Sequence, residues 1–155
     1  MRRTCLLMFI GLLLTACSGD DGGDDGDARV EASGGGLDPC ALATDSMLIS
    51  YFGDATIEGE TSEAGPIDSC SWRDANANSL LIQVAVDHPL TRLDGCDTCV
   101  DLTFGDDGYA SPSPFQSTAT FVVGNNWYSV TTTGFGDDAD AIAALAEMVF
   151  DAASE

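Results

Sequence analysis

The chain has 155 residues, of which 45% are hydrophobic and 20% charged, and its formal net charge at pH 7 is −21. Five basic residues stand against 26 acidic ones, and there is no lysine. Proteins bind nucleic acids and anionic lipid headgroups largely through cationic side chains, so this composition excludes both as partners.

Residues 1–16 have the layout of a secretory signal. Two arginines precede an unbroken apolar run over residues 5–14, and small residues lead from there to Cys17. The run is shorter than the roughly 20 apolar residues that a membrane-spanning helix needs. Residues 14–17, Leu-Thr-Ala-Cys, also resemble the lipobox of bacterial lipoproteins, which implies cleavage before Cys17 and acylation of its thiol. Two or more acyl chains hold a protein firmly on a membrane.

The sequence thus predicts a lipid-anchored, extracytoplasmic protein of the bacterial cell envelope. The membrane is a partner only through the lipid on Cys17. Ser18 stands where many lipoproteins retained in the inner membrane have aspartate. We therefore favour the outer membrane in a two-membrane cell, and the outer face of the plasma membrane in a cell with one membrane. Removal of the signal leaves three basic residues against 26 acidic ones, a net charge of −23.

Residues 17–36 are predicted to form a disordered tether. They are rich in glycine and aspartate and contain almost nothing apolar to bury. A flexible chain of this length spans roughly 25 Å, and repulsion between its aspartates extends it further. Calcium is the alternative ligand for these aspartates, but the D-x-[DN]-x-[DN]-G loop that binds it is absent from the segment.

Residues 37–155 are predicted to form a single domain that begins with short helices. Asp38 suits a helix N-cap, and Pro39 suits the first helical position. Helical structure restarts at Thr44 and ends at Gly53, with one apolar face formed by Leu48, Tyr51 and Phe52.

Two β-hairpins are predicted to follow a polar, turn-rich segment over residues 59–66. Residues 69–73 place Cys70 and Trp72 on one side of a strand, and residues 80–87 return with one apolar face, formed by Leu80, Ile82, Val84 and Val86. The second hairpin joins residues 118–123 to residues 127–133. Both runs are rich in β-branched and aromatic residues and flank a Gly-Asn-Asn turn.

An amphipathic helix ends the chain. Three aspartates, Asp137, Asp138 and Asp140, lie at its positive end, and its apolar stripe consists of Ile142, Leu145, Ala146, Val149 and Ala153. Because short turns join the paired strands, the sheet is expected to be antiparallel. We therefore predict an α+β fold, in which an antiparallel sheet of hairpins carries the N-terminal short helices and the C-terminal helix and is stapled by disulfides.

Four cysteines lie in the exported domain: Cys40, Cys70, Cys96 and Cys99. An even number outside the cytoplasm indicates disulfides, for which three connectivities exist. We favour Cys40 with Cys70 and Cys96 with Cys99. On the chain-entropy estimate, the first bond closes a loop of about 30 residues and contributes roughly 3.7 kcal/mol, whereas the second closes a very small loop and contributes roughly 2 kcal/mol.

Several short motifs together resemble the actinobacterial-type lipoproteins known as domain of unknown function 3558. The matching residues are the lipobox ending at Cys17, Asp38-Pro39-Cys40 with Leu42 and Thr44 behind it, Cys70-Ser71-Trp72, Phe104-Gly105-Asp106-Asp107 and the terminal helix. In order and spacing the resemblance covers nearly all of residues 37–155. It implies an envelope location and a disulfide between a helix and a strand, Cys40 to Cys70, and it brings no established activity. The pair Cys96 and Cys99 is not a feature of the family pattern.

The C-x-x-C motif at residues 96–99 is the strongest candidate for chemistry. Redox-active pairs lie at a helix N-terminus or beside cations that stabilise the thiolate. Here three aspartates flank the pair, Asp94, Asp97 and Asp101, and residues 100–104 are predicted to be extended. We therefore favour a structural disulfide. Zinc would need two more ligands, and the single histidine, His88, leaves one position open, so no metal is expected.

Hydrolytic and acid–base chemistry are also disfavoured. A serine nucleophile needs a neighbouring base, for which His88 is the one histidine, and no G-x-S-x-G elbow occurs. The adjacent pairs Asp106-Asp107 and Asp137-Asp138 are predicted to be turn or cap residues, because neighbours in sequence usually point apart. Trp72 and Trp127 are predicted to pack in the core or on the sheet and not to form a ligand platform.

The sequence as a whole favours a tethered envelope module with no catalytic residue, metal or cofactor. Such a module would bind an envelope protein, another envelope component or a small apolar ligand, or would have a structural role. Two alternatives stay open: thiol–disulfide exchange at Cys96 and Cys99, and calcium binding by the aspartates near residues 106 and 137.

Overall fold

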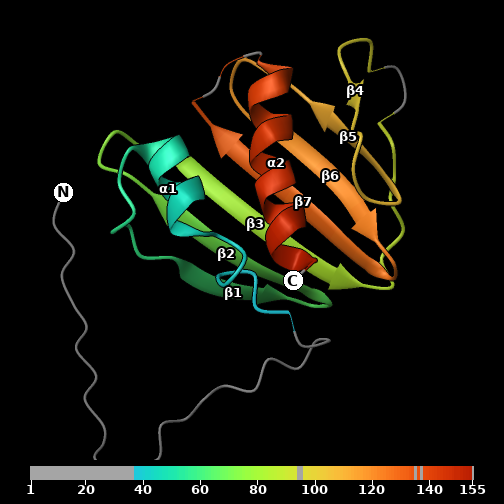
Figure 1. Ribbon diagram of the computed structural model, residues 1–155, viewed down its shortest axis with the longest axis horizontal. Helices are drawn as coiled ribbons and strands as arrows, with labels where there is room; N and C mark the ends of the chain where they lie inside the picture. The colour runs from blue at the N-terminus through green and yellow to red at the C-terminus, as the bar shows by residue number, and fades with distance from the viewer. Residues whose placement is uncertain (1–36, 94–95, 135, 137, 155) are drawn as a thin grey trace, which may run out of the picture. The chain divides into compact units, whose positions relative to one another are not determined.

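The computed structural model describes residues 37–93, 96–134, 136 and 138–154. The predicted signal, Cys17, the tether, Asp94 and Asp137 lie outside these residues. The described residues form a seven-stranded antiparallel sheet and two helices, which share one face of the sheet (Figure 1). The predicted α+β class, with an antiparallel sheet and a C-terminal helix packed on it, is confirmed.

The elements follow one another as α1, seven strands and α2. The helices are α1 (Asp45–Phe52) and α2 (Ala139–Ala153). The strands are β1 (Glu60–Ala64), β2 (Ile67–Arg73), β3 (Ser79–Val86), β4 (Val100–Asp101), β5 (Asp107–Ser111), β6 (Ser117–Val123) and β7 (Asn126–Thr133). Their order in the sheet is β1-β2-β3-β7-β6-β5-β4, so β1 and β4 are the two edges.

Both predicted hairpins are confirmed, and the sheet joins them in its centre. Cys70 of β2 pairs with Ile82 of β3, and Ala119 of β6 pairs with Val130 of β7. The strands β3 and β7 pair with each other, with Ile82 opposite Val130. Because directly opposite residues of paired strands point to the same face of a sheet, these four side chains share one face, the one that the helices cover.

The core lies between this face of the sheet and the helices. The predicted stripe of α2 is buried at Ile142, Leu145, Ala146 and Val149. On the sheet, Cys70, Trp72, Leu80 and Ile82 are buried, and the ring of Phe121 stacks on that of Tyr128 with 5.0 Å between centroids. Asp138 is the N-cap of α2, because its carboxylate accepts a hydrogen bond from the Ala141 amide.

The prediction of a helix beginning at Pro39 is wrong. Residues 39–42 form hydrogen-bonded turns, in which the Cys40 amide donates to the Asp38 carboxylate. Thr44 has extended backbone angles, φ −71° and ψ 156°, and is the N-cap of α1, so it separates the turns from that helix. The end of α1 is confirmed: Gly53 has φ 76°, and its amide donates to the carbonyl of Ile49.

Two strands lie where the sequence did not predict them. The segment at residues 59–66 contains β1, all five residues of which are exposed, and β5 runs beside β6. Conversely, the extended structure predicted for residues 100–104 is limited to the two residues of β4.

Candidate functional site

Cys40 and Cys70 form a disulfide, as predicted, with 5.1 Å between their Cα atoms. Cys70 is fully buried on the helix-covered face of β2. The bond therefore ties the turns before α1 directly to the core of the sheet.

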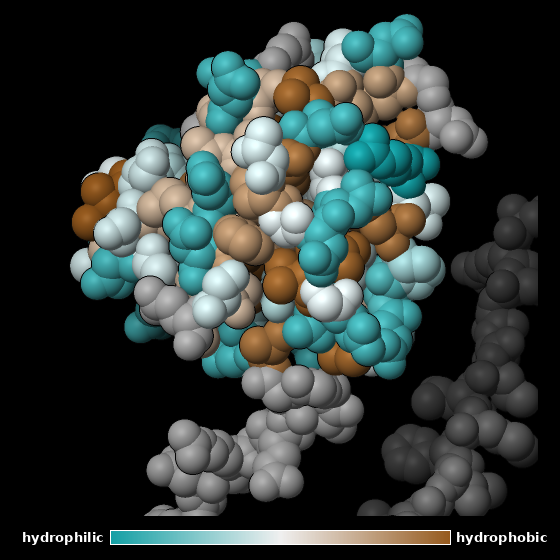
Figure 2. Space-filling view, turned by 45° about the vertical axis from the view of Figure 1, so that its right-hand side comes forward, coloured by the Kyte–Doolittle hydropathy of each residue, from teal (hydrophilic) through white to brown (hydrophobic). Residues whose placement is uncertain are grey.

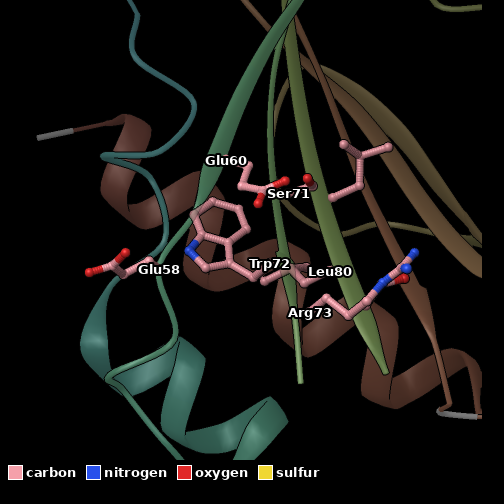
Figure 3. A pocket seen from close by; sticks show the side chains of 8 residues that line it. Glu58, Glu60, Ser71, Trp72, Arg73 and Leu80 are labelled. Atoms are coloured by element: carbon pink, nitrogen blue, oxygen red, sulfur yellow. The ribbon is translucent and has the colours of Figure 1, made fainter. Parts of the chain in front are cut away.

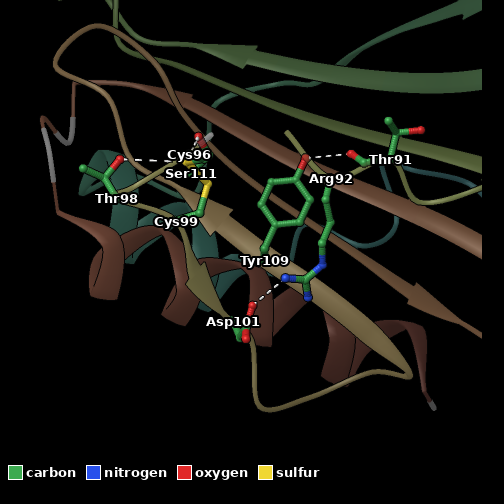
Figure 4. The surroundings of a disulfide bond; sticks show 8 residues. All are labelled: Thr91, Arg92, Cys96, Thr98, Cys99, Asp101, Tyr109 and Ser111. Carbon is green, nitrogen blue, oxygen red and sulfur yellow. Dashed lines mark hydrogen bonds and ion pairs between the residues drawn. A yellow bond between two sulfur atoms is a disulfide. The ribbon is translucent and has the colours of Figure 1, made fainter. Parts of the chain in front are cut away.

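Cys96 and Cys99 also form a disulfide, in the turn that precedes β4 (Figure 4). Both residues are half-buried. The Cys96 Sγ lies 3.8 Å from the Ser111 hydroxyl and 3.9 Å from that of Thr98. The groups next to this sulfur are thus hydroxyls, and the pair precedes a strand and not a helix.

Arg92 fastens the long connection between β3 and β4 to the face of the sheet opposite the helices. Its guanidinium donates to Asp101 at 2.7 Å, and its carbon lies 5.7 Å from the centre of the Tyr109 ring (Figure 4). It also donates to Asp107 at 2.9 Å. The Tyr109 hydroxyl donates to the carbonyl of Thr91 at 3.0 Å. The hydrogen bond from Arg92 lowers the pKa of the Asp107 carboxyl.

The predicted turn and cap roles hold for Asp106 and Asp138. The prediction is wrong for Asp107, which is the first residue of β5 and lies opposite Val122 of β6. Asp106 accepts a hydrogen bond from the Gly124 amide in the β6–β7 turn, whereas Asp107 faces Arg92, so the two carboxylates have different neighbours. His88 lies edge-on against Trp127, with 5.1 Å between ring centroids. Among the described residues, no three His, Cys, Asp or Glu side chains gather where they could hold a metal ion.

A groove of about 280 Å³ lies between α2 and residues 100–104. We call it the α2 groove; its apolar residues are Val100, Leu102, Phe104, Ala143 and Ala144, and its polar ones are Asp101, Thr103, Asp140 and Glu147. Figure 2 brings the β4 side of the domain forward and shows apolar side chains interspersed among hydrophilic ones. Our sequence reasoning missed this groove. The sequence feature that could have indicated the groove is a pair of alanines, Ala143 and Ala144, that lies between the acidic residues Asp140 and Glu147 of α2.

A second hollow, of about 610 Å³, is lined by Thr98, Pro112, Ser113, Pro114 and Ala139. Ala139 precedes Asp140 in α2, and Thr98 lies two residues before Val100, so this hollow lies near the α2 groove. Phe115, next to Pro114 in the β5–β6 loop, is 85% exposed.

A third hollow, of about 540 Å³, lies where β1 begins, beyond which Trp72 and Arg73 of β2 have no partner in β1. The Trp72 indole lies there beside Glu58 and Glu60, with Arg73 on the other side of β2 (Figure 3). Trp72 is only 3% exposed. This confirms its prediction as a core residue, because a stacking platform for a ligand needs an open ring face.

The chain matches no protein-family model, no curated protein and no solved structure. The resemblance to domain of unknown function 3558 stays a prediction from the motifs. Neither of the described helices is long and apolar enough to span a bilayer.

Proposed function

We propose that the protein is a lipid-anchored module of the bacterial cell envelope that binds a partner and does not catalyse a reaction. The observation that favours binding over catalysis is that the side chains that could react already make structural contacts. Asp107 pairs with Arg92, Asp106 accepts from a turn amide, Asp138 caps α2, and His88 lies against Trp127. None of these contacts is the nucleophile–base pair that covalent catalysis requires.

The two disulfides support a location outside the cytoplasm, where such bonds form and persist. They stabilise a small domain whose single core lies on one face of its sheet. The lipid anchor rests on the lipobox alone, and the tether of 20 residues that follows would let the domain reach a partner away from the membrane.

Thiol–disulfide exchange at Cys96 and Cys99 is the second candidate function. It is favoured by the partial exposure of both residues to solvent. Two aspartates, Asp97 and Asp101, oppose it, because negative charge beside a thiol disfavours the reactive thiolate. Calcium binding is less favoured than exchange, since Asp106 and Asp107 do not converge on one centre.

Fractionation of cells that produce the full chain tests the anchor. The wild-type protein should sediment with membranes and carry acyl mass on Cys17, whereas Cys17→Ser should accumulate as an uncleaved precursor without that mass. Cys5→Ser, inside the predicted signal, is the matched control and should be processed normally. A cleaved, unacylated wild-type protein in the soluble fraction would contradict the anchor.

An insulin-reduction assay tests the absence of exchange activity. We expect the wild-type rate to equal that of Cys96→Ser/Cys99→Ser. A wild-type rate well above that of the variant would favour the exchange function instead.

A further inference from the structure

We propose that the α2 groove binds a positively charged, extended segment of a partner protein, with apolar side chains of that segment against Leu102 and Phe104. This inference rests on the proposed binding function and gives it a site and a partner chemistry.

The floor of the groove is apolar and rigid. Phe104 packs against Phe121 and Phe150, with ring centroids 5.4 Å and 5.3 Å apart. A Cβ added at Gly108 would lie 3.1 Å from Leu102 Cδ1, so Leu102 rests directly on the backbone of β5. Val100 at the mouth is 44% exposed. Burying such surface against an apolar side chain contributes about 25 cal/mol per Å².

The groove exists because α2 carries alanines where it faces residues 100–104. Ala143 flanks the buried stripe and is partly buried, Ala144 is exposed, and their single methyl groups leave the floor open. The volume, about 280 Å³, lies just below the roughly 300–1,000 Å³ of sites that enclose a small molecule. It therefore suits one or two side chains of a larger partner better than a whole small ligand.

The rim of the groove is acidic along α2. Asp140 and Glu147 are exposed there, whereas the charge of Asp101, on the β4 side, is paired with Arg92 on the other face of the sheet. Among the described residues, no basic side chain lines the groove, and Arg73 lies on β2 near the opposite edge of the sheet. Charge complementarity thus favours a cationic occupant. A second copy of this chain is disfavoured as the occupant, because its own negative net charge would be repelled by the acidic rim.

The spacing of the acids indicates an extended occupant. Asp140 and Glu147 are seven residues apart, which is about 10 Å along an α-helix. Three residues of an extended chain cover about the same distance, at roughly 3.3 Å each. A segment with two lysines three residues apart and apolar residues between them would therefore match the distance between the two acids.

Fluorescence anisotropy with a labelled Gly-Lys-Leu-Val-Lys-Gly peptide tests the proposal, using the mature lipoprotein in neutral-lipid nanodiscs. We expect saturable binding that weakens as salt rises. Peptides with serine for Leu-Val, or with glutamate for both lysines, should bind at least about tenfold more weakly. Equal binding of the serine peptide would overturn the apolar contact, and absence of binding by the lysine peptide would overturn the cationic partner.

Variants locate the binding site. Asp140→Asn/Glu147→Gln should raise the Kd about fivefold, because it removes the two exposed ion pairs expected with the lysines. Glu60→Gln/Glu63→Gln in β1, at the opposite edge of the sheet, makes the same change in net charge and should leave the Kd within about twofold. An equal effect of both pairs would overturn the proposal, because it would show attraction by the overall charge.

A steric variant gives a second, charge-free test. Ala144 is exposed, so Ala144→Trp should fill the groove without disturbing the core and abolish peptide binding. Ala75→Trp, in the exposed β2–β3 turn, is the matched control and should bind like the wild type. Binding by Ala144→Trp with unchanged affinity would place the peptide elsewhere and overturn the proposal. If the protein is acylated and membrane-bound as expected but the peptide tests fail, the proposed binding site is wrong, whereas the proposed function as a lipid-anchored binding module is not contradicted.

Discussion

Removal of the disulfide between Cys40 and Cys70 should destabilise the fold about twice as much as removal of the one between Cys96 and Cys99. The two bonds join residues 30 and 3 positions apart, and the chain-entropy estimate gives roughly 3.7 and 2 kcal/mol. Unfolding about 120 residues has an entropy of about 250 cal/mol/K. The melting temperature should therefore fall by about 15 °C in Cys40→Ala/Cys70→Ala and by about 8 °C in Cys96→Ala/Cys99→Ala.

Burial widens the difference between the two variants. Cys70 is fully buried, so its truncation also removes packing from the core, whereas Cys96 and Cys99 are half-buried at the edge of the sheet. Reversible thermal unfolding of the mature chain, followed by circular dichroism, measures both effects. Equal decreases, or a larger decrease for the pair at the edge, would refute the reasoning from loop length and burial.

Three further predictions concern single contacts. The Tyr51 hydroxyl donates to main-chain carbonyls of β3 and β7. Tyr51→Phe should therefore lower the free energy of unfolding, measured in urea, by about 1–3 kcal/mol. An unchanged free energy would contradict this bridging role. A Cβ on Gly59 would lie 2.7 Å from the buried Trp72 indole. Gly59→Ala should therefore lower the free energy of unfolding by about 1–3 kcal/mol in the same assay. An unchanged midpoint of unfolding would contradict the close packing. Arg92→Ala should raise the pKa of Asp107, measured by NMR titration. The pKa of Asp107 is lowered in the folded protein, so the stability that the ion pair contributes is present above the unfolded pKa of about 4. It is lost as pH falls through the folded-state pKa, so the variant should differ in stability from the wild type at pH 7 and converge with it as the pH falls through that value.

Elements whose side chains alternate or repeat strongly were predictable from the sequence. Leu80, Ile82 and Val84 of β3 face the core in the expected alternation, and α2 buries its expected stripe. In both cases one face contacts the core and the other contacts solvent, so burial leaves a periodic pattern in the chain.

The missed strands lack that pattern for physical reasons. β1 is exposed along its whole length, so nothing in its sequence, Glu-Thr-Ser-Glu-Ala, had to be apolar. In β5 the residues that face the helices are Gly108 and Ala110, whose small size leaves room for Leu102. The pairing of β3 with β7 joins segments about 50 residues apart, and no local signal specifies it.

The disulfides were predictable because four cysteines in the domain allow only three pairings, whereas the α2 groove was not. The groove depends on residues 100–104 standing beside α2, a contact between segments about 40 residues apart. Ala143 and Ala144 are common helix residues, and they line a groove only because residues 100–104 lie beside them. Asp140, which the sequence indicated as a charge at the helix start, also becomes part of the rim.

The reduction potential of the Cys96–Cys99 disulfide tests most directly the central claim, that the domain binds a partner and does not exchange disulfides. It can be measured on the mature protein by mass spectrometry after equilibration in thiol buffers of known potential. Our account predicts a value below about −300 mV, as structural disulfides have. A value between about −120 and −270 mV, the range of exchange catalysts, would contradict it and make Cys96 and Cys99 an active site.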